Sequence, residues 1–273
     1  MKNFSNKIRL ETLKMFKHRG FGHLGGSLSI VEVLSVLYSK VMKINPKDID
    51  WKGRDYLVLS KGHAGPALYA TLALKGYFDI NWLMTLNDNK TNLPSHCDHL
   101  KTPGIDMTTG SLGQGISSAV GIAKALKFEN ASNLVFTIVG DGELNEGQCF
   151  EAIQFASHHK LDNLIIFVDE NKIQLDGFTK DISDQRDLIV KFNAFGFHSA
   201  RVDGHNEKLI LEAINTAISK VGQPSVIVLD TVKGKGIEKF ENIIGNHHMR
   251  FSKDDLLIID KKINELEEVI IWV

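Results

Sequence analysis

Two apolar runs that each lead into a short polar segment constrain this chain more than any other feature of its sequence. Residues 134–139 lead into Gly140-Asp141-Gly142-Glu143, and residues 164–168 lead into Asp169-Glu170-Asn171-Lys172. Apolar residues at helical spacing lie between the runs, so the pattern predicts a strand–helix–strand unit. Open α/β sheets bind their ligands at the carboxyl ends of strands. We therefore expect both polar segments to contribute to one site.

The side chains of these segments suit a hard divalent cation. Asp141 offers a carboxylate, Asn171 offers an amide oxygen, and a backbone carbonyl such as that of Ile173 completes an all-oxygen set. Such ligands fit Mg²⁺ or Ca²⁺. Gly140 and Gly142 allow the backbone to approach a phosphate, and the helix that follows directs its N-terminus to the same place. The pattern predicts a metal–diphosphate site, whereas a Gly-Asp-Gly alone would indicate only a turn.

The composition is that of an ordinary globular protein. Of the 273 residues, 43% are hydrophobic, and the formal net charge is −1, so the sequence lacks a basic surface for nucleic acid. No apolar run is long enough to span a membrane, and the N-terminus lacks the apolar segment of a secretory signal. The two cysteines, Cys97 and Cys149, are too few for a disulfide framework and predict reduced thiols in a cytoplasmic protein.

Strand and helix patterns alternate along the chain. Apolar runs predict strands at residues 134–139, 164–168 and 225–230, and further strands are expected at residues 55–60 and 197–202. Helical spacing predicts helices at residues 4–19, 67–74, 116–126 and 206–220 and from residue 254 onward. Another helix is expected near residue 30, with Ser29 and Glu32 as its capping box. Continuous apolar strands alternating with helices predict one three-layer α/β/α domain over residues 1–273, with a mostly parallel sheet.

Several glycine-rich loops carry polar side chains. Four glycines surround His23, which suggests that a ligand approaches the backbone there, although a lone loop histidine would be solvated. His63 follows the first strand, and its ring N–H groups suit diphosphate oxygens. The glycines of residues 108–115 do not directly follow a strand or show G-x-G-x-x-G spacing, which disfavours a dinucleotide site. Lys233 and Lys235 are expected to be a solvated pair.

A zinc site is the other alternative that the sequence raises. His96, Cys97, Asp98 and His99 lie within four residues, which is a possible half of such a site. No second ligand cluster has the spacing of a zinc site, so this interpretation is disfavoured.

Taken together, the loops resemble the diphosphate-binding half of transketolase. The matching segments follow the order of that family across nearly the whole chain and are Gly22-His23, Ser60-Lys61-Gly62-His63-Ala64, His96, Thr109–Gly115, Gly140–Glu143, Glu146-Gly147, Asp169–Lys172 and Gly234–Gly236. The resemblance implies a thiamine diphosphate-binding fold and a dependence on thiamine diphosphate and Mg²⁺ (or Ca²⁺).

The resemblance also implies a role for each matching residue. Asp141, Asn171 and the carbonyl of Ile173 would bind the metal ion. The cofactor-binding residues would be His63, Gly110, Leu112, Gly142, Glu143, Ile173 and His247. Among them, the two histidines and the amide of Gly142 would contact the diphosphate.

Three histidines would act on the substrate by the same resemblance. His23, His96 and His247 would face it, and His96 or His247 would remove the hydroxyl proton that permits carbon–carbon cleavage, because imidazole titrates near neutral pH. His247 is followed by His248, and Asn246 stands where the family often has tryptophan, so either histidine can be the ligand.

The complete family carries a pyrimidine-binding domain and a third domain beyond this one, and this chain has neither. The resemblance therefore implies the N-terminal subunit of a split transketolase, with a separate C-terminal subunit in a heterotetramer of two copies each. Glu146 and Glu151 match carboxylates at the subunit contact. The assembled enzyme would move a two-carbon ketol unit between sugar phosphates, from a ketose to an aldose, and this chain alone would be inactive.

Other functions remain open because a fold does not determine a substrate. The chain can belong to another thiamine enzyme, similar to 1-deoxyxylulose-5-phosphate synthase or to a 2-oxoacid dehydrogenase. It can also be a non-catalytic paralogue or a nucleotide-binding module. The donor and acceptor sugars are not encoded in the motifs.

Overall fold

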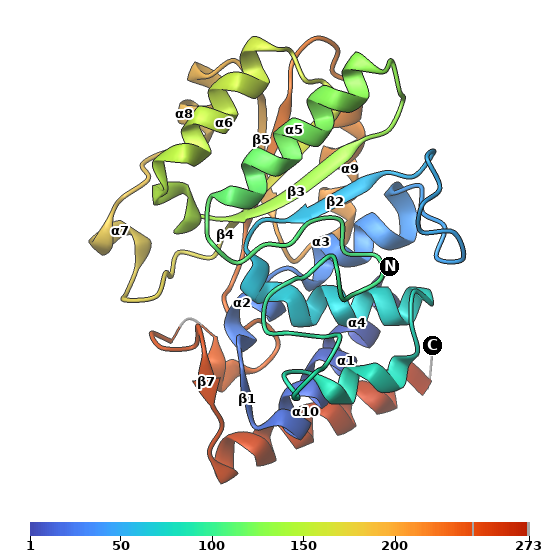
Figure 1. Ribbon diagram of the computed structural model, residues 1–273. Helices are drawn as coiled ribbons and strands as arrows, with labels where there is room; N and C mark the ends of the chain where they lie inside the picture. The colour runs from blue at the N-terminus through green and yellow to red at the C-terminus, as the bar shows by residue number, and fades with distance from the viewer. Residues whose placement is uncertain (242, 272–273) are drawn as a thin grey trace.

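A computed structural model describes residues 1–241 and 243–271 and shows helices on both faces of a five-stranded sheet (Figure 1). The strands lie in the order β2 (Tyr56–Leu59), β3 (Val135–Gly140), β4 (Leu164–Glu170), β6 (Ser225–Asp230) and β5 (His198–Asp203). All four neighbouring pairs are parallel. The predicted three-layer α/β/α fold with a parallel sheet is therefore confirmed.

Three helices cover one face of the sheet: α5 (Gln114–Phe128), α6 (Gly147–His158) and α8 (Leu188–Ala194). They bury alternate strand residues, such as Val135 and Val139, in one apolar cluster. Successive strand side chains point to opposite faces, so the residues between them face the other layer.

The second layer is larger and consists of α1 (Lys2–Arg19), α3 (Val31–Val36), α4 (Gly65–Lys75), α9 (Glu207–Ile218) and α10 (Lys253–Ile271). Phe136 and Phe167 of the sheet are fully buried against it. Together the two clusters cover both faces of β2, β3, β4 and β6, which explains why these strands are largely continuous apolar runs, whereas the edge strand β5 is polar and partly exposed.

Short strands, helices and turns connect these layers. A two-stranded antiparallel sheet joins β1 (Phe21–Gly22) to β7 (Met249–Arg250). The remaining elements are α2 (Leu24–Leu28), α7 (Thr179–Ile182), a π-helical turn (Leu37–Val41) and 3₁₀ turns at Gly62–Ala64, Ile80–Thr85, Glu143–Asn145 and Glu238–Phe240.

The predicted capping box at Ser29 and Glu32 is wrong. The Ser29 hydroxyl donates to Asp169 Oδ2 at 2.8 Å, and its oxygen lies 3.1 Å from the carbonyl oxygen of Gly26. Glu32 instead forms an ion pair with Arg9 and contacts His205. Both side chains are buried, so distant charged partners compete successfully with the local backbone.

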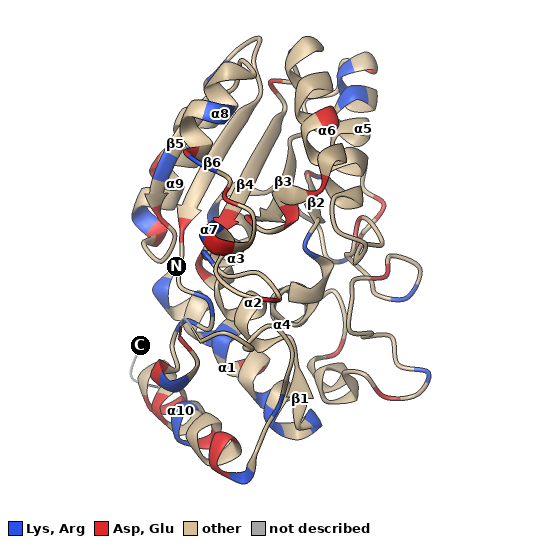
Figure 2. Cartoon of the chain, turned by 90° about the vertical axis from the view of Figure 1, so that its left-hand side faces the viewer, with Lys and Arg blue, Asp and Glu red and all other residues tan. Residues whose placement is uncertain are grey.

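The carboxyl ends of the parallel strands meet at one edge and bring acidic residues together there (Figure 2). Asp141 follows β3, and β4, β5 and β6 end at Glu170, Asp203 and Asp230. Within the described part of the chain, no helix has the length and hydropathy of a membrane span.

Candidate active site

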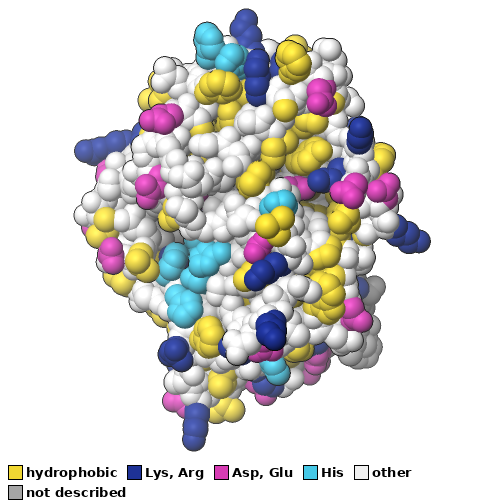
Figure 3. Space-filling model, viewed as in Figure 1, with side chains coloured by type: hydrophobic (Ala, Val, Ile, Leu, Met, Phe, Trp, Pro, Cys, Tyr) yellow, Lys and Arg dark blue, Asp and Glu magenta, His cyan; other side chains and the backbone are white. Residues whose placement is uncertain are grey.

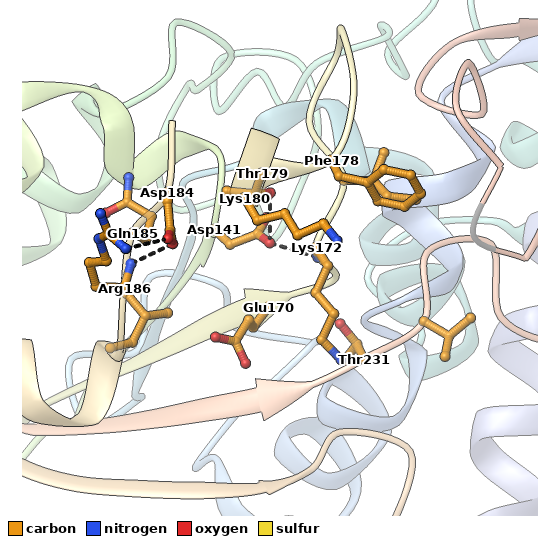
Figure 4. Close-up of a pocket in the computed structure, with 13 residues that line it drawn as sticks. Asp141, Glu170, Lys172, Phe178, Thr179, Lys180, Asp184, Gln185, Arg186 and Thr231 are labelled. Atoms are coloured by element: carbon orange, nitrogen blue, oxygen red, sulfur yellow. Dashed lines mark hydrogen bonds and ion pairs between the residues drawn. The ribbon is translucent and has the colours of Figure 1, made fainter. Parts of the chain in front are cut away.

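The two polar segments that follow β3 and β4 lie in direct contact. Gly140 pairs with Asp169 in the sheet, and the Asp141 amide donates to the carbonyl of Asp169 at 3.1 Å. The Lys172 amide then donates to Asp141 Oδ2 at 2.7 Å, and the Thr179 hydroxyl donates to the same oxygen at 3.2 Å (Figure 4). Neighbouring parallel strands thus place the predicted metal ligands on adjacent loops.

The carboxylate of Asp141 is buried, which makes its negative charge unfavourable. The residue is 3% exposed, and burial, with a smaller contribution from Asp169, raises the pKa of its carboxyl group to about 6. A buried carboxylate whose charge is unfavourable gains from a bound cation. This electrostatic environment fits the divalent ion that the sequence predicts.

The other two predicted metal ligands are also buried oxygen donors. Asn171 is 5% exposed, and its amide nitrogen donates to Asp169 Oδ2 at 2.7 Å, which fixes the direction of its amide oxygen. Ile173 is 3% exposed, and its carbonyl accepts a hydrogen bond from Lys233 Nζ at 3.0 Å. Carboxylate, amide and carbonyl oxygens together are the donor set that Mg²⁺ prefers.

A buried ion pair between Lys61 and Asp169 lies beside the predicted metal ligands and contacts Asn171. Their side chains are 1% and 0% exposed. Burial alone would raise the pKa of Asp169, but the charge of Lys61 and hydrogen bonds from Thr231 and Ser29 hold that pKa below its ordinary value. The pair therefore keeps an ionised carboxylate available to orient Asn171. Both residues lie within motifs of the sequence, but the motifs predicted no role for either of them.

Five histidines from distant parts of the chain gather around one point on the surface (Figure 3). The β1–β7 pairing explains part of this, because His23 follows β1 and His248 directly precedes β7. The ring centre of His23 lies 5.2 Å from that of His96, 5.5 Å from that of His247 and 5.6 Å from that of His63. The structure thus brings the three predicted catalytic histidines together with the predicted phosphate ligand.

Most of these histidines are neutral at physiological pH. Burial, together with the neighbouring histidines and Lys233, lowers the pKa of His23 to about 3. Burial and Lys233 lower the pKa of His247 to about 4, and the pKa values of His63 and His96 are lowered in the same direction. A neutral imidazole has one N–H donor and one acceptor nitrogen, so each ring can bind an oxygen or accept a proton.

The structure places His247 and His248 differently, although the sequence could not separate them. His247 lines the cavity described below, and its ring centre is 4.5 Å from that of His63. His248 is exposed and stacks edge-on against His23 at 4.7 Å, on the outer side of the cluster. This geometry favours His247 as the residue that reaches a bound ligand.

A cavity of about 380 Å³ opens between the two strand ends and the histidines. The predicted residues that line it are His63, Leu112, Asp141, Gly142, Glu143, Asn171, Ile173 and His247. Only glycine fits at position 142, because a Cβ on Gly142 would lie 2.8 Å from the Cβ of Gln174. Gly110, His23 and His96 do not line this cavity. Gly110 packs against His96 instead, because a Cβ on Gly110 would lie 3.1 Å from the His96 ring.

Glu143 holds three loops of the site together. Its Oε1 accepts hydrogen bonds from the Ser60 hydroxyl and from the Gly113 amide at 2.9 Å, and its Oε2 accepts one from the Gly140 amide at 3.0 Å. Glu143 is 2% exposed, and both of its carboxylate oxygens accept hydrogen bonds from these donors. The observed contacts are structural, and its place among the cofactor-binding residues stays a prediction.

Lys233 is not the solvated lysine that the sequence predicted. It is 2% exposed, and its ammonium lies 3.5 Å from His247 Nδ1 in addition to its contact with the Ile173 carbonyl. Burial and the charge of Lys61 lower the pKa of Lys233 to about 8. The glycine loop around it folds inward and delivers a positive charge to the cavity, which the sequence did not reveal.

A second cavity of about 420 Å³ lies on the other side of the segment that holds the predicted metal ligands (Figure 4). Asp141 and Ile173 line both cavities, so this segment forms the wall between them. Lys172 lines the second cavity and pairs with Asp230 at the same strand edge. No pattern in the sequence predicted this second space.

The geometry gives no support to a zinc site at residues 96–99. Cys97 is 1% exposed and packs in the apolar core, where burial raises the pKa of its thiol to about 12. Across the described parts of the chain, no group of three or more His, Cys, Asp or Glu side chains is placed to hold a metal ion.

Comparison with solved structures identifies the fold. Transketolase from Campylobacter jejuni matches 97% of this chain with a TM-score of 0.89 and 29% sequence identity, and a transketolase variant from Pichia stipitis matches 98% with a TM-score of 0.88 and 30% identity. This chain spans 43% and 44% of the length of those two proteins. A family model described as the thiamine diphosphate-binding domain of transketolase matches residues 1–264. The fold and site therefore define a thiamine diphosphate-binding domain.

Comparison with curated proteins narrows the assignment. The 6-deoxy-6-sulfo-D-fructose transketolase subunit SqwG of Clostridium sp. (strain MSTE9) is 52% identical over 250 residues, which cover 92% of this chain and 91% of that protein. One subunit of the apulose-4-phosphate transketolase of Actinobacillus succinogenes is 40% identical over 83% of this chain and 82% of that protein. The chain belongs to the transketolase family, whose members are transferases. The predicted resemblance is confirmed.

Proposed function

We propose that this chain is the diphosphate-binding subunit of a cytoplasmic split transketolase. With Mg²⁺ and thiamine diphosphate, it would act beside a separate C-terminal subunit that carries the pyrimidine-binding domain, in a heterotetramer of two copies each. The assembled enzyme would transfer a two-carbon ketol unit from a ketose to an aldose. The observation that carries the proposal is the contact between Asp141 and the Asn171 loop at the edge of a cavity that His63 and His247 line.

The metal ion would be held by Asp141, by the amide oxygen of Asn171 and by the carbonyl of Ile173. All three residues are buried at the cavity wall. The diphosphate would lie against His63, His247 and the amide of Gly142. Lys233 adds a positive charge at the same place, which favours an anionic group.

The rest of the cofactor would occupy the groove between two apolar side chains. Leu112 and Ile173 line the cavity from opposite loops, with Gly110 beyond Leu112 toward His96. Bound thiamine diphosphate supplies a carbon nucleophile that stabilises the negative charge developed during carbon–carbon cleavage. The contribution of this chain is to position that group and to exclude water from it.

Three histidines would handle the substrate. His23, His96 and His247 are close enough to surround a sugar, and each neutral ring can accept a hydroxyl proton or donate to a carbonyl oxygen. Since their pKa values are lowered, the three rings are neutral at neutral pH, so each has a free nitrogen that can accept a hydrogen bond from a substrate hydroxyl. The same lowering makes them weaker bases than a free imidazole, so bound substrate and cofactor have to favour the protonated ring during proton transfer.

Loss of the charged metal ligand provides the direct test. Asp141→Asn should raise the dissociation constant for magnesium thiamine diphosphate by at least about tenfold in calorimetry, because one anionic ligand is lost. Asp260→Asn, a surface carboxylate on α10, is the matched control and should bind as the wild type does. Unchanged affinity in Asp141→Asn would contradict the metal assignment.

Activity is expected only from the assembled enzyme. The isolated chain should show no ketol transfer, and mixing with the C-terminal subunit should produce it with ketose and aldose phosphates. Full transfer by the chain alone would contradict the split-subunit proposal. Decarboxylation of pyruvate by the complex would favour a 1-deoxyxylulose-5-phosphate synthase-like or 2-oxoacid dehydrogenase-like enzyme, and tight ATP or NAD binding would favour a nucleotide-binding module.

A sulfonated ketose is a second candidate donor. The 52% identity to a 6-deoxy-6-sulfo-D-fructose transketolase subunit extends over 91% of that protein. Comparison of 6-deoxy-6-sulfofructose with fructose 6-phosphate as donors for the assembled enzyme would separate the two. A higher kcat/KM for the sulfonate would assign the chain to sulfosugar metabolism.

A further inference from the structure

We infer that Arg9, Glu32 and His205 are positioning residues that hold Lys233 at the diphosphate site from behind. None of the three lines the cavity between the strand ends. They come from α1, from α3 and from the loop between β5 and α9, and they meet beneath the glycine loop that follows β6. The inference rests on the proposed function, because it gives Lys233 a role toward the cofactor.

The loop of residues 231–236 is anchored by backbone groups on both sides of Lys233. The Val232 amide donates to His205 Nε2 at 2.9 Å. The carbonyl of Lys235 accepts a hydrogen bond from Arg9 Nη1 at 2.6 Å. These two hydrogen bonds hold Val232, just before Lys233, and Lys235, two residues after it. They therefore fix the direction in which the Lys233 side chain leaves the loop.

Glu32 links Arg9 and His205, the two side chains that anchor the loop. One carboxylate oxygen forms an ion pair with Arg9 Nη2, and the other lies 3.1 Å from His205 Nδ1. A backbone amide can only donate, so His205 Nε2 accepts from Val232 and the proton of the neutral ring lies on Nδ1, where it donates to Glu32. Arg9 and Glu32 are 6% and 8% exposed, so the network is largely shielded from water.

The packing leaves little freedom for this arrangement to change. Gly236 has a φ angle of 102°, and a Cβ there would lie 3.0 Å from Arg9 Cδ. The opposite side of the loop is held by the Gly234 amide, which donates to the carbonyl of Gly25 at 3.1 Å. A buried network with satisfied partners is rigid. It can therefore hold a buried ammonium group near the Ile173 carbonyl and His247.

The test compares magnesium pyrophosphate binding by variants of the full chain in calorimetry. Glu32→Gln keeps the size of the side chain but loses the charge that joins the anchors, and Lys233→Met removes the ammonium. Each should raise the dissociation constant by about tenfold, the lower end of the effects seen for outer residues of binding sites. The double variant should bind no more than about twofold worse than Lys233→Met, because Glu32 acts through Lys233.

Several controls separate positioning from general stability. Asp106→Asn is the matched buried carboxylate, since Asp106 pairs with Arg54 at 2.6 Å away from the cavity, and it should bind pyrophosphate as the wild type does. If Glu32→Gln does not fold, His205→Ala replaces it, because the side chain of His205 is 15% exposed and its removal takes away the acceptor of the Val232 amide. Arg9→Lys should retain only part of the wild-type affinity for magnesium pyrophosphate, because one ammonium cannot reach every acceptor of the guanidinium.

The outcomes distinguish this inference from the proposed function. If Asp141→Asn and Lys233→Met weaken pyrophosphate binding but Glu32→Gln does not, or adds its full effect to that of Lys233→Met, the positioning role is wrong. If Asp141→Asn and Lys233→Met bind normally, the diphosphate site itself is wrong. A loss in Glu32→Gln that disappears in the Lys233→Met background would establish the positioning role.

Discussion

Burial and neighbouring groups determine the protonation states of the residues in the site. His23 is half-buried among other histidines, which makes its protonated form unfavourable. Asp141 shows the opposite case, because burial raises the pKa of its carboxyl group toward 6. Both shifts favour the neutral form of the isolated group, and a cation at Asp141 would reverse that preference.

The histidine cluster should make the protein sensitive to acid. The pKa of His23 falls from 6.5 to about 3 on folding, so its contribution to the free energy of unfolding is fully present above pH 6.5 and is lost as the pH falls toward 3. His23→Asn should therefore lose about 1–2 kcal/mol less stability than the wild type between pH 7 and pH 4. Urea unfolding at several pH values measures this difference.

The exposed His18 gives the matched control for this prediction. His18→Asn removes a histidine outside the cluster and should keep the pH dependence of the wild type. If His23→Asn and the wild type lose the same stability on acidification, burial of the cluster does not oppose protonation.

Elements meet at the site because glycines permit close contact. The N-terminus of α5 packs on the loop after β2, where a Cβ on Gly115 would lie 2.6 Å from the Cα of Ser60. The Ser60 hydroxyl accepts from the Ile116 amide at 3.0 Å and donates to Glu143. The helix, the strand end and the Gly-Asp-Gly-Glu loop are thus joined at one point.

Two glycines of the same helix should respond in opposite ways to alanine. Gly115→Ala should destabilise the protein by about 1–3 kcal/mol, because the backbone of Ser60 has to move. Gly121→Ala should stabilise it by about 0.5–1 kcal/mol, since nothing lies within 4 Å of the added Cβ and alanine favours the helix. Thermal unfolding compares them. A neutral Gly115→Ala would show that α5 can move away from β2 at no cost.

The whole molecule leaves apolar side chains exposed around the mouth of the cavity. Leu175 and Ile182 line the cavity with 62% and 49% of their surfaces exposed, and Ile244, near His247, is 57% exposed. Exposed apolar groups at the rim of a polar site are typical of a surface that a partner covers. The proposed C-terminal subunit would complete the site at this position.

A charge at this rim should weaken the complex. Leu175→Asp should raise the dissociation constant for the C-terminal subunit by at least about tenfold, because a buried carboxylate would lack a partner. Leu257→Asp on α10 is the matched control, since Leu257 is 68% exposed away from the cavity, and it should assemble normally. Analytical ultracentrifugation of the mixed subunits measures both. Equal assembly of the two variants would place the partner elsewhere.

Local sequence patterns were sufficient for the fold. The alternation of strand and helix patterns predicted every strand of the five-stranded sheet and its parallel arrangement, because four of the strands are apolar runs that the core buries between two helical layers. They also predicted that Asp141 and Asn171 would lie at neighbouring strand ends. These features depend on periodicity and on connection order, which a linear sequence contains.

Only the tertiary structure determines which side chains of distant loops come into contact. The sequence predicted a solvated Lys233, yet the loop buries it, and the capping box expected at Ser29 and Glu32 gives way to partners more than 20 residues away. His247 and His248 are chemically equal in the sequence, and only the β1–β7 pairing directs one into the cavity and the other outward. Periodicity determines which face of an element is buried, but the packing of loops determines which polar groups meet, because their partners come from unrelated parts of the chain.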